Sequence, residues 1–259
     1  MNFQEIYEQN LVNAQDRDID SGALSNEPVM TTGLITPEST INIQPLFGIE
    51  FSLDKDGMSE IISMFQEQWD KLSDSEKKNL VSILTTIYSV TETYLGGHVI
   101  DQNRKNAYMQ KDDCHLTLSE IKGKQLGACA ERAAIGHQLL NLLQLSGAIN
   151  YDSILTNSRL TEKERNLHSF IILKSRKDPS KAFLFDIENP VDYKEKEDSK
   201  PAKGIALYQL TEQELKDFEN SKSISPKSIY EQFGMILLGD RRIYGEGKKD
   251  KNDNNDIDY

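Results

Sequence analysis

Three residues carry the side-chain types used in thiol catalysis, and they follow one another in the order cysteine, histidine, aspartate. They are Cys129, His168 and Asp186. A cysteine becomes a nucleophile when a neighbouring histidine takes its proton. A carboxylate behind the histidine fixes the imidazole tautomer and stabilises its charged form. Thiol-dependent acyl transfer is therefore the first functional hypothesis that the sequence raises.

Cys129 lies at the expected start of a helix that runs from near Ala128 to about Leu145, with Gly147 shortly after its end. The first N–H groups of a helix have no partner within it and carry a partial positive charge. Both properties favour the thiolate over the thiol, and the same N–H groups could hold an oxyanion. A buried, inert cysteine is the alternative that this position alone leaves open.

His168 and Asp186 lie on two apolar stretches that predict strands, residues 166 to 174 and 182 to 187. If these strands form an antiparallel hairpin in which His168 opposes Asp186, residue 174 opposes residue 180, and Ser175 to Pro179 form the loop. Directly opposed side chains share a face, with Cβ atoms about 5 Å apart. The spacing can therefore place the carboxylate beside the imidazole. A core histidine and a turn-capping aspartate are the alternatives.

Three sequence blocks surround these residues. They are Gly127 to Ala133 (GACAERA), which continues through Leu139-Leu140 to Gly147, then His168-Ser169-Phe170, and then Phe185 to Pro190 (FDIENP). Together they resemble the core of the transglutaminase-like superfamily, which belongs to the papain-like cysteine enzymes. The resemblance covers about Ile121 to Asp192. Members of this group include peptidases, transglutaminases and effector-type protein glutamine deamidases.

The resemblance implies a role for each of the three residues and a fold to hold them. Cys129 is the nucleophile, His168 the base and acid, and Asp186 the orienting carboxylate, with no metal or cofactor. The implied fold class is α/β (α+β), with a papain-like or transglutaminase-like core in which a helix bearing the cysteine packs on an antiparallel sheet bearing the histidine and aspartate. The family often has Trp two residues after the histidine, where this chain has Phe170. No family oxyanion residue is clear; Gln125 is a guess, and an ordinary polar loop residue is the favoured reading.

The implied activity is that of a thiol-dependent hydrolase acting on amide bonds of a protein or peptide, either a cysteine protease or a protein glutamine deamidase. A transglutaminase or another thiol acyltransferase would use the same triad. A non-enzymatic binding module with a decayed site is the competing class of protein.

A second resemblance surrounds the cysteine. Leu126 to Ile135 (LGACAERAAI) is similar to the zinc motif of small cytidine deaminases, in which the cysteine binds zinc and the glutamate shuttles protons. That mechanism needs two further cysteines downstream, and no cysteine follows Cys129. Replacing them by His168 and Asp186 is chemically possible but departs from the pattern. Glu131 is then read as a first-turn acid that favours the helix dipole.

Composition and charge narrow the classes of protein. The chain has 259 residues, 42 acidic and 30 basic, and a net charge of -12. The charge has the wrong sign for tracking nucleic-acid phosphates or docking on an anionic membrane. The two cysteines, Cys114 and Cys129, exclude a disulfide scaffold, and Cys114 is read as a free thiol. The sequence shows no signal peptide and no spanning segment. We therefore expect a cytoplasmic protein, or one secreted by a signal-peptide-independent route; the oligomeric state is not indicated.

The expected organisation is a flexible N-terminal arm over residues 1–45, a papain-like catalytic domain over residues 46–245 and a disordered polar tail over residues 246–259. Within the domain, Ser73 with Glu76 predicts a capping box that opens a helix ended by Gly96-Gly97. The other expected elements are a helix over Met58 to Leu72, a strand over Asp152 to Thr156, an exposed loop over Asp192 to Lys203, a helix capped by Thr211 and Glu214, and a helix opened by Ser225-Pro226.

Overall fold

The structure of the chain, a computed structural model, describes residues 1–16, 18–19, 29–44, 49–97, 99–159, 167–194, 202–220 and 236–237. The helices are α1 (Phe3–Leu11), α2 (Lys55–Lys71), α3 (Leu80–Leu95), α4 (Asp101–Met109), α5 (Leu118–Ile121), α6 (Cys129–Leu145) and α7 (Glu212–Glu219). The strands are β1 (Asp18–Ile19), β2 (Val29–Thr32), β3 (Thr40–Gln44), β4 (Ile49–Ser52), β5 (His115–Thr117), β6 (Tyr151–Arg159), β7 (Leu167–Ser175), β8 (Ala182–Lys194), β9 (Ala202–Gln209) and β10 (Ile236–Leu237).

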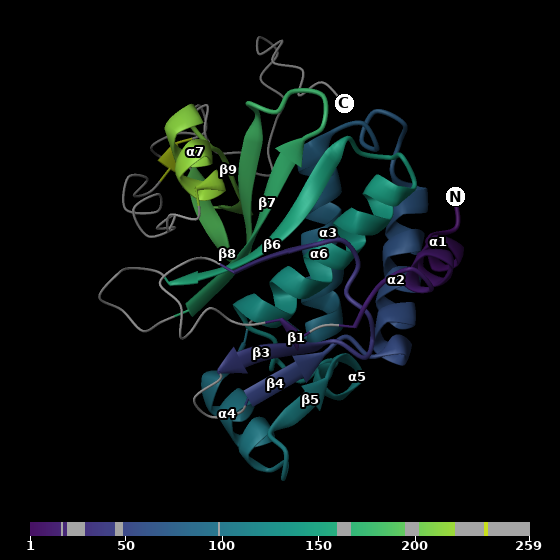
Figure 1. Ribbon diagram of the computed structural model, residues 1–259, viewed down its shortest axis with the longest axis vertical. Coiled ribbons are helices and arrows are strands. Elements are labelled where there is room, and N and C mark those ends of the chain that lie inside the picture. Colours follow the sequence, from purple (N-terminus) through teal and green to yellow (C-terminus); the bar gives the residue numbers. More distant parts are fainter. Residues whose placement is uncertain are drawn as a thin grey trace.

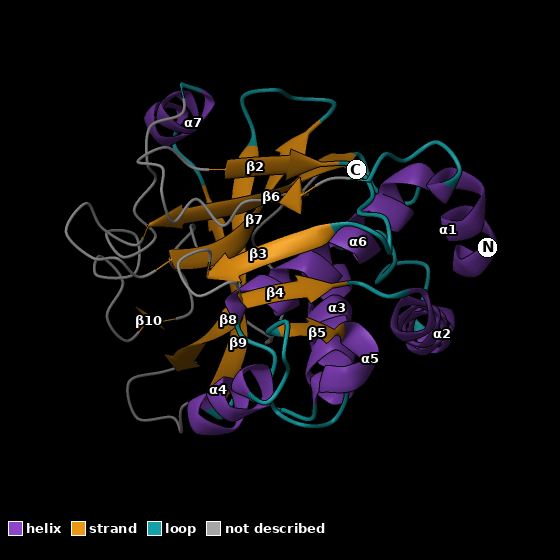
Figure 2. Cartoon of the chain, turned by 60° about the horizontal axis from the view of Figure 1, so that its bottom comes forward, coloured by secondary structure: helices purple, strands orange, loops and turns teal. Residues whose placement is uncertain are grey.

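The strands form two sheets. Within the described ranges, the larger sheet has the order β10-β8-β7-β6-β2, with β9 also paired to β8, and only β10 runs parallel to its neighbour. The smaller sheet has the order β1-β3-β4-β5 and lies beside α4 and α5 (Figures 1 and 2). The fold is therefore of the mixed α+β class that the sequence predicted.

The two faces of the larger sheet are covered by different helices. On β7, Ile171 and Leu173 belong to the main core beneath α6, whereas Phe170 and Ile172 belong to a second, smaller core beneath α7. This alternation follows from the two-residue repeat of a strand. Figure 1 shows α7 on one side of the sheet, and α6 and α3 on the other.

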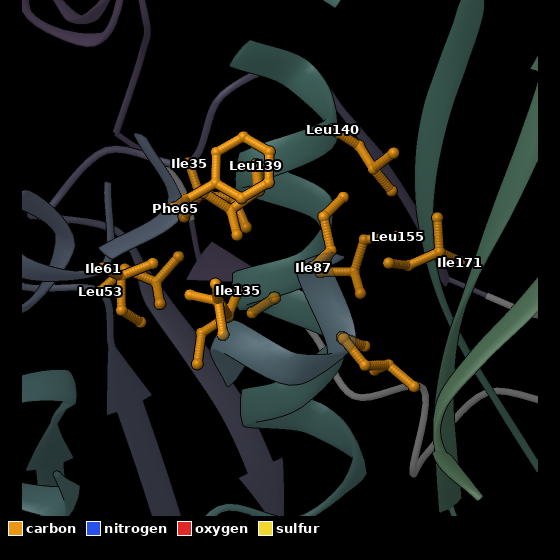
Figure 3. Close-up of a cluster of buried hydrophobic side chains, with 14 of the residues drawn as sticks. Ile35, Leu53, Ile61, Phe65, Ile87, Ile135, Leu139, Leu140, Leu155 and Ile171 are labelled. Atoms are coloured by element: carbon orange, nitrogen blue, oxygen red, sulfur yellow. The ribbon is translucent and has the colours of Figure 1, made fainter. Parts of the chain in front are cut away.

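Helix α6 is the centre of the molecule, because every residue from Ala130 to Leu143 is buried. Ile135 and Leu139 face Ile61 and Phe65 of α2, and on the other side of the helix lies Ile171 of the sheet (Figure 3). A helix that is buried on all sides has no solvent-facing stripe for its polar residues. Each polar side chain on α6 must therefore find a partner inside the protein.

Three polar residues in the middle of α6 bind the chain segment between β2 and β3, and we call them the backbone clamp: His137, Gln138 and Asn141. Gln138 accepts from the Ile35 N–H (2.9 Å) and donates to the Ile35 carbonyl (2.6 Å). The His137 ring lies 2.8 Å from the Gly33 carbonyl and 2.9 Å from the Ser153 hydroxyl. Asn141 Nδ2 also donates to the Gly33 carbonyl. The clamp fixes this N-terminal segment against the helix.

The expectation of a flexible arm over residues 1–45 is corrected for the part that the structure describes. Residues 3–11 form α1, in which Asn2 caps the first turn and the buried Phe3 ring lies edge-on to Trp69, 5.6 Å between centroids. Residues 29–32 form β2, an edge strand of the larger sheet. Ile35 is fully buried. Few apolar residues recur periodically here, because each one packs on an element distant in sequence.

The predicted helix after Ser73 begins later than the capping box indicated. Ser73 and Glu76 do exchange hydrogen bonds, but residues 74–78 form only a turn. Helix α3 begins at Leu80, where Asn79 accepts from the Ser82 N–H. Its predicted end is confirmed, since Gly96 adopts a left-handed φ of 80° and closes the helix.

The remaining predictions fall into two groups. The helices over residues 58–72 and 128–145 and the strands over residues 152–156 and 166–174 agree with α2, α6, β6 and β7 within a few residues at each end. The strand over residues 182–187 agrees with β8 at its start but ends seven residues too early. Thr211 and Glu214 cap α7 as expected. The loop expected over Asp192 to Lys203 is shorter, because β8 continues to Lys194 and β9 begins at Ala202. The helix expected at Ser225-Pro226 and the tail over residues 246–259 lie outside the described residues.

Candidate active site

Cys129 is the first residue of α6, as predicted, and a special local structure places it there. Ala128 is extended, and having no polar side chain it cannot cap the helix; Glu131 Oε2 instead accepts from the Ala128 N–H at 3.1 Å. A side chain at Gly127 would collide with Leu95, whose Cδ1 would lie 2.6 Å from the added Cβ. A larger residue at this position would therefore force the buried Leu95 side chain to move.

His168 and Asp186 meet as the sequence predicted. His168 Nε2 lies 2.7 Å from Asp186 Oδ2, and the two residues are 5% and 1% exposed. The second carboxylate oxygen, Asp186 Oδ1, accepts from the Glu188 N–H at 3.0 Å. Because each of its two oxygens is held by a different N–H group, the carboxylate has a fixed orientation towards the imidazole.

The predicted register of this hairpin is wrong by two residues. Lys174 pairs with Ala182, not with residue 180. The reason is the turn: the Lys181 N–H donates to the Asp178 carbonyl, so Pro179 lies at the second position of a four-residue turn, where its fixed φ is favoured. A shift of two keeps every side chain on its face. The contact between the histidine and the aspartate therefore survives, as a diagonal pair.

Cys129 completes the group. Its side chain lies near enough to His168 to act on the charge of the imidazole. Burial lowers the pKa of the His168 imidazole, but the Asp186 carboxylate and Cys129 raise it more, so its pKa lies well above the usual value. An imidazole in this environment keeps its proton at neutral pH. The structure thus brings together all three residues that the sequence singled out.

Two arginines and three carboxylates surround the first turn of α6, and we call them the ionic cluster: Arg104, Arg132, Glu92, Glu131 and Glu188. Glu131 and Arg132 are fully buried. Glu131 Oε1 accepts from Arg104 Nη2 at 2.7 Å and from the Tyr108 hydroxyl at 2.9 Å. With Ala128 on its other oxygen, this carboxylate is engaged on both sides.

Arg132 connects four segments of the chain. It donates to the carbonyls of Gly127 (3.1 Å) and Gly97 (2.6 Å), and it pairs with Glu92 of α3. Its Nε also lies 2.6 Å from Glu188 Oε2 on β8. The single Nε hydrogen is directed to Gly127, so the contact with Glu188 is an ion pair and not an aligned hydrogen bond. One guanidinium therefore joins the loop before the cysteine to the strand that carries the aspartate.

The carboxyl of Glu188 has a raised pKa. Burial raises its pKa to about 7, although the Arg132 guanidinium acts in the opposite direction. Asp186 and Glu131 contribute to the upward shift, because a like charge nearby disfavours ionisation. Glu188 therefore titrates close to neutrality, two residues from the candidate triad.

Sequence reasoning missed most of the ionic cluster. It read Glu131 as a first-turn acid, a position that the structure confirms, but did not single out Arg104, Arg132 or Glu188 for a role. One signal was present: Glu131 and Arg132 stand together in a helix that carries no other Asp, Glu, Lys or Arg, and charged residues are rarely fully buried unless they are paired. The partners could not be read from the sequence because they come from α3, α4 and β8.

The other candidates lie elsewhere. Gln125 has a positive φ of 57° and its backbone bonds to Leu95 and Ile100, which is consistent with a structural loop residue. His137 belongs to the backbone clamp. Cys114 is partly buried and free, and the His115 ring bonds to the Ser52 hydroxyl. His98 lies outside the described residues.

The described residues were also compared with the requirements of a metal site and of a membrane-spanning helix. Over these ranges, no three His, Cys, Asp or Glu side chains are grouped so that they could hold a metal ion. Similarly, none of the helices described is both long and apolar enough to cross a membrane.

Comparison with known proteins identifies no relative. No family model, curated protein or solved structure matches the chain. The functional argument therefore rests on the geometry of the site.

Proposed function

We propose that the protein is a thiol-dependent hydrolase of amide bonds in proteins or peptides, with Cys129 as nucleophile, His168 as general base and acid, and Asp186 as orienting carboxylate. One observation carries the proposal. A buried histidine at the start of β7 hydrogen-bonds Asp186 at 2.7 Å, and the cysteine that opens α6 lies near enough to raise the pKa of the same imidazole. A nucleophile, a base and an orienting group in this order are the requirement for an activated thiol.

The geometry assigns a role to each nitrogen of the imidazole. Nε2 is held by Asp186, so Nδ1 is the nitrogen that serves the sulfur. With a raised pKa, His168 carries both protons and places a positive charge beside the Cys129 sulfur. The thiolate adds to the amide carbonyl carbon, and the Nδ1 proton passes to the departing amine or ammonia. Water, deprotonated by the same nitrogen, then hydrolyses the thioester and releases the acid and the free thiol.

The proposal extends to the transglutaminase-like group of papain-like cysteine enzymes. Its support is the order of the elements: a cysteine that opens a central helix, then a histidine and an aspartate on neighbouring antiparallel strands. The role of Glu131 supports this group over the deaminase-like motif. Both of its oxygens are engaged by Ala128, Arg104 and Tyr108, whereas a proton shuttle needs a carboxylate that faces the substrate.

The substrate class follows from the same chemistry. We propose hydrolysis of a peptide or isopeptide bond, with deamidation of a glutamine side chain as the closest variant, since both release an amine or ammonia from an acyl-enzyme. A net charge of -12 favours encounter with basic protein partners.

Thiol labelling tests the assignment of the nucleophile. At neutral pH, iodoacetamide should modify Cys129 at least about tenfold faster than Cys114, because only Cys129 lies beside a charged imidazole. Peptide mass spectrometry measures both sites in one sample. Faster labelling of Cys114 would show that the nucleophile is assigned wrongly.

A proteome comparison tests the reaction. Wild type and Cys129→Ala are incubated with the same cellular proteins and read by mass spectrometry. New chain termini found only with wild type identify a protease, and a Gln-to-Glu mass change on an intact backbone identifies a deamidase. If neither signal appears and the enzyme instead transfers acyl groups to small amines, the protein-substrate proposal is wrong.

A further inference from the structure

Arg104 lies on α4 and reaches the first turn of α6. Its Nη2 donates to Glu131 Oε1 at 2.7 Å, and its guanidinium lies over the ring of Tyr108, 5.1 Å from the centroid. The side chain is 13% exposed. Arg104 is therefore held at two points but retains a small accessible surface.

One donor of this guanidinium has no acceptor. Arg104 Nε is buried and has no hydrogen-bond partner among the residues that the structure describes. Arg132, the other arginine of the ionic cluster, differs: Nε, Nη1 and Nη2 all have acceptors. A buried N–H without an acceptor is costly, and in a native protein it calls for an explanation. Glu131 does not serve it, since its Oε1 accepts from Arg104 Nη2 and the Tyr108 hydroxyl and its Oε2 from the Ala128 N–H.

The surroundings of this donor point to the candidate nucleophile. Glu131, which holds Arg104, also holds the N–H of Ala128, the residue before Cys129. Burial lowers the pKa of the Arg104 guanidinium, but the Glu131 carboxylate raises it more, and Cys129 adds to the upward shift. The Glu131 carboxylate thus links the Arg104 guanidinium to the backbone of the residue that precedes Cys129.

We propose that Arg104 forms an anion-binding position beside Cys129. In this position the Arg104 Nε–H donates a hydrogen bond to a negatively charged oxygen of the molecule that reacts with the thiol. This inference rests on the proposed function. The oxygen has two possible sources with the same chemistry: a carboxylate that the substrate brings, or the oxyanion produced when the thiolate adds to the carbonyl carbon and the C=O π pair moves to oxygen.

Two rate ratios at Cys129 test the proposal without a known substrate. The first compares alkylation by iodoacetate and by iodoacetamide, in which the thiolate displaces iodide and the reagents differ in a carboxylate. The second compares acylation by the neutral ester p-nitrophenyl acetate with alkylation by iodoacetamide, because only acylation forms an oxyanion. Each ratio cancels any change in the amount of thiolate.

Arg104→Lys is the sharpest variant, since its single ammonium can still pair with Glu131 but supplies no Nε–H. Arg104→Met removes the charge as well. The matched control is Arg176→Met, which removes an arginine whose side chain is 54% exposed on the hairpin. Circular dichroism melting confirms that each variant is folded, and Arg104→Lys decides alone if Arg104→Met does not fold.

We expect one ratio to fall about tenfold in both Arg104 variants and to stay within about twofold in the control. A fall in the iodoacetate ratio identifies a substrate carboxylate, and a fall in the acylation ratio identifies the oxyanion. If both ratios are unchanged in Arg104→Lys and Arg104→Met, the inference is wrong. Failure of the proposed function is a separate result, because it appears in wild type as a Cys129 no more reactive than Cys114.

Discussion

Helix α6 carries polar side chains of two clusters, and the two clusters satisfy their buried polar atoms in different ways. The ionic cluster at the first turn of α6 uses full charges and joins α3, α4 and β8. The backbone clamp, two turns further on, binds the carbonyl and amide groups of the segment between β2 and β3. The difference between the two clusters follows from what each of them holds in place. Charges are used around Cys129, the proposed nucleophile, and hydrogen bonds to backbone suffice where a segment only has to be attached.

The largest effect is expected from breaking the ionic cluster. Arg132→Met should lower the free energy of unfolding by about 3–5 kcal/mol, because it leaves buried carboxylates without their cation. Urea unfolding followed by circular dichroism measures this loss. In the control, Arg176→Met, an exposed arginine paired with Asp152 is removed, and the change should stay within about 0.5 kcal/mol. Equal losses in the two variants would contradict the comparison.

A smaller loss is expected from breaking the backbone clamp. Gln138→Ala leaves the buried N–H and carbonyl of Ile35 without partners and should cost about 2–3 kcal/mol. Because the clamp does not reach the site, iodoacetamide should label Cys129 in this variant at the wild-type rate. A folded Gln138→Ala protein with a strongly slowed Cys129 would show that the clamp also positions the nucleophile.

The smallest expected change in stability depends on pH, and only the ionic cluster should show this dependence. Glu188 has a pKa raised to about 7, so the folded state binds its proton more tightly than the unfolded chain does. For such an acid, stability falls as pH rises from about 4.5 to about 7. Glu188→Gln cannot titrate, and its stability relative to wild type should therefore improve by on the order of 2 kcal/mol between pH 4.5 and pH 8.

Urea unfolding of both proteins at the two pH values measures this difference. Gln138→Ala is the reference, since an amide does not titrate and its removal should cost the same at both pH values. If the difference between Glu188→Gln and wild type is constant with pH, Glu188 does not titrate near neutrality in the folded protein.

Local signals carried the part of the fold and site that could be predicted. A glycine before Cys129 and a dense apolar stretch after it marked the start of α6, and Thr211 with Glu214 marked the cap of α7. Apolar stretches around His168 and Asp186 marked the strands that hold them. Each of these signals lies within a few residues of the feature that it predicts.

The rest depended on contacts between distant segments. Phe3 packs against Trp69, and Arg132 pairs with Glu188, so neither residue reveals its role within its own stretch of sequence. The hairpin register failed for a different reason. Asp178-Pro179 is a turn signal in the sequence, but placing Pro179 at the end of the loop instead of inside the turn shifts the pairing by two.

The attachment of the N-terminal segment to α6 also sets an order of assembly. Ile35 and Gln138 are 103 residues apart in sequence, and β2 can pair with β6 only after α6 and β6 exist. Contacts of this range close late, because the chain entropy of the intervening loop must be lost first. A chain growing from its N-terminus makes α1 and β2 long before their partners. We therefore expect the N-terminal segment to dock in a late folding step, when the earliest-synthesised residues join a helix and a sheet that have already formed.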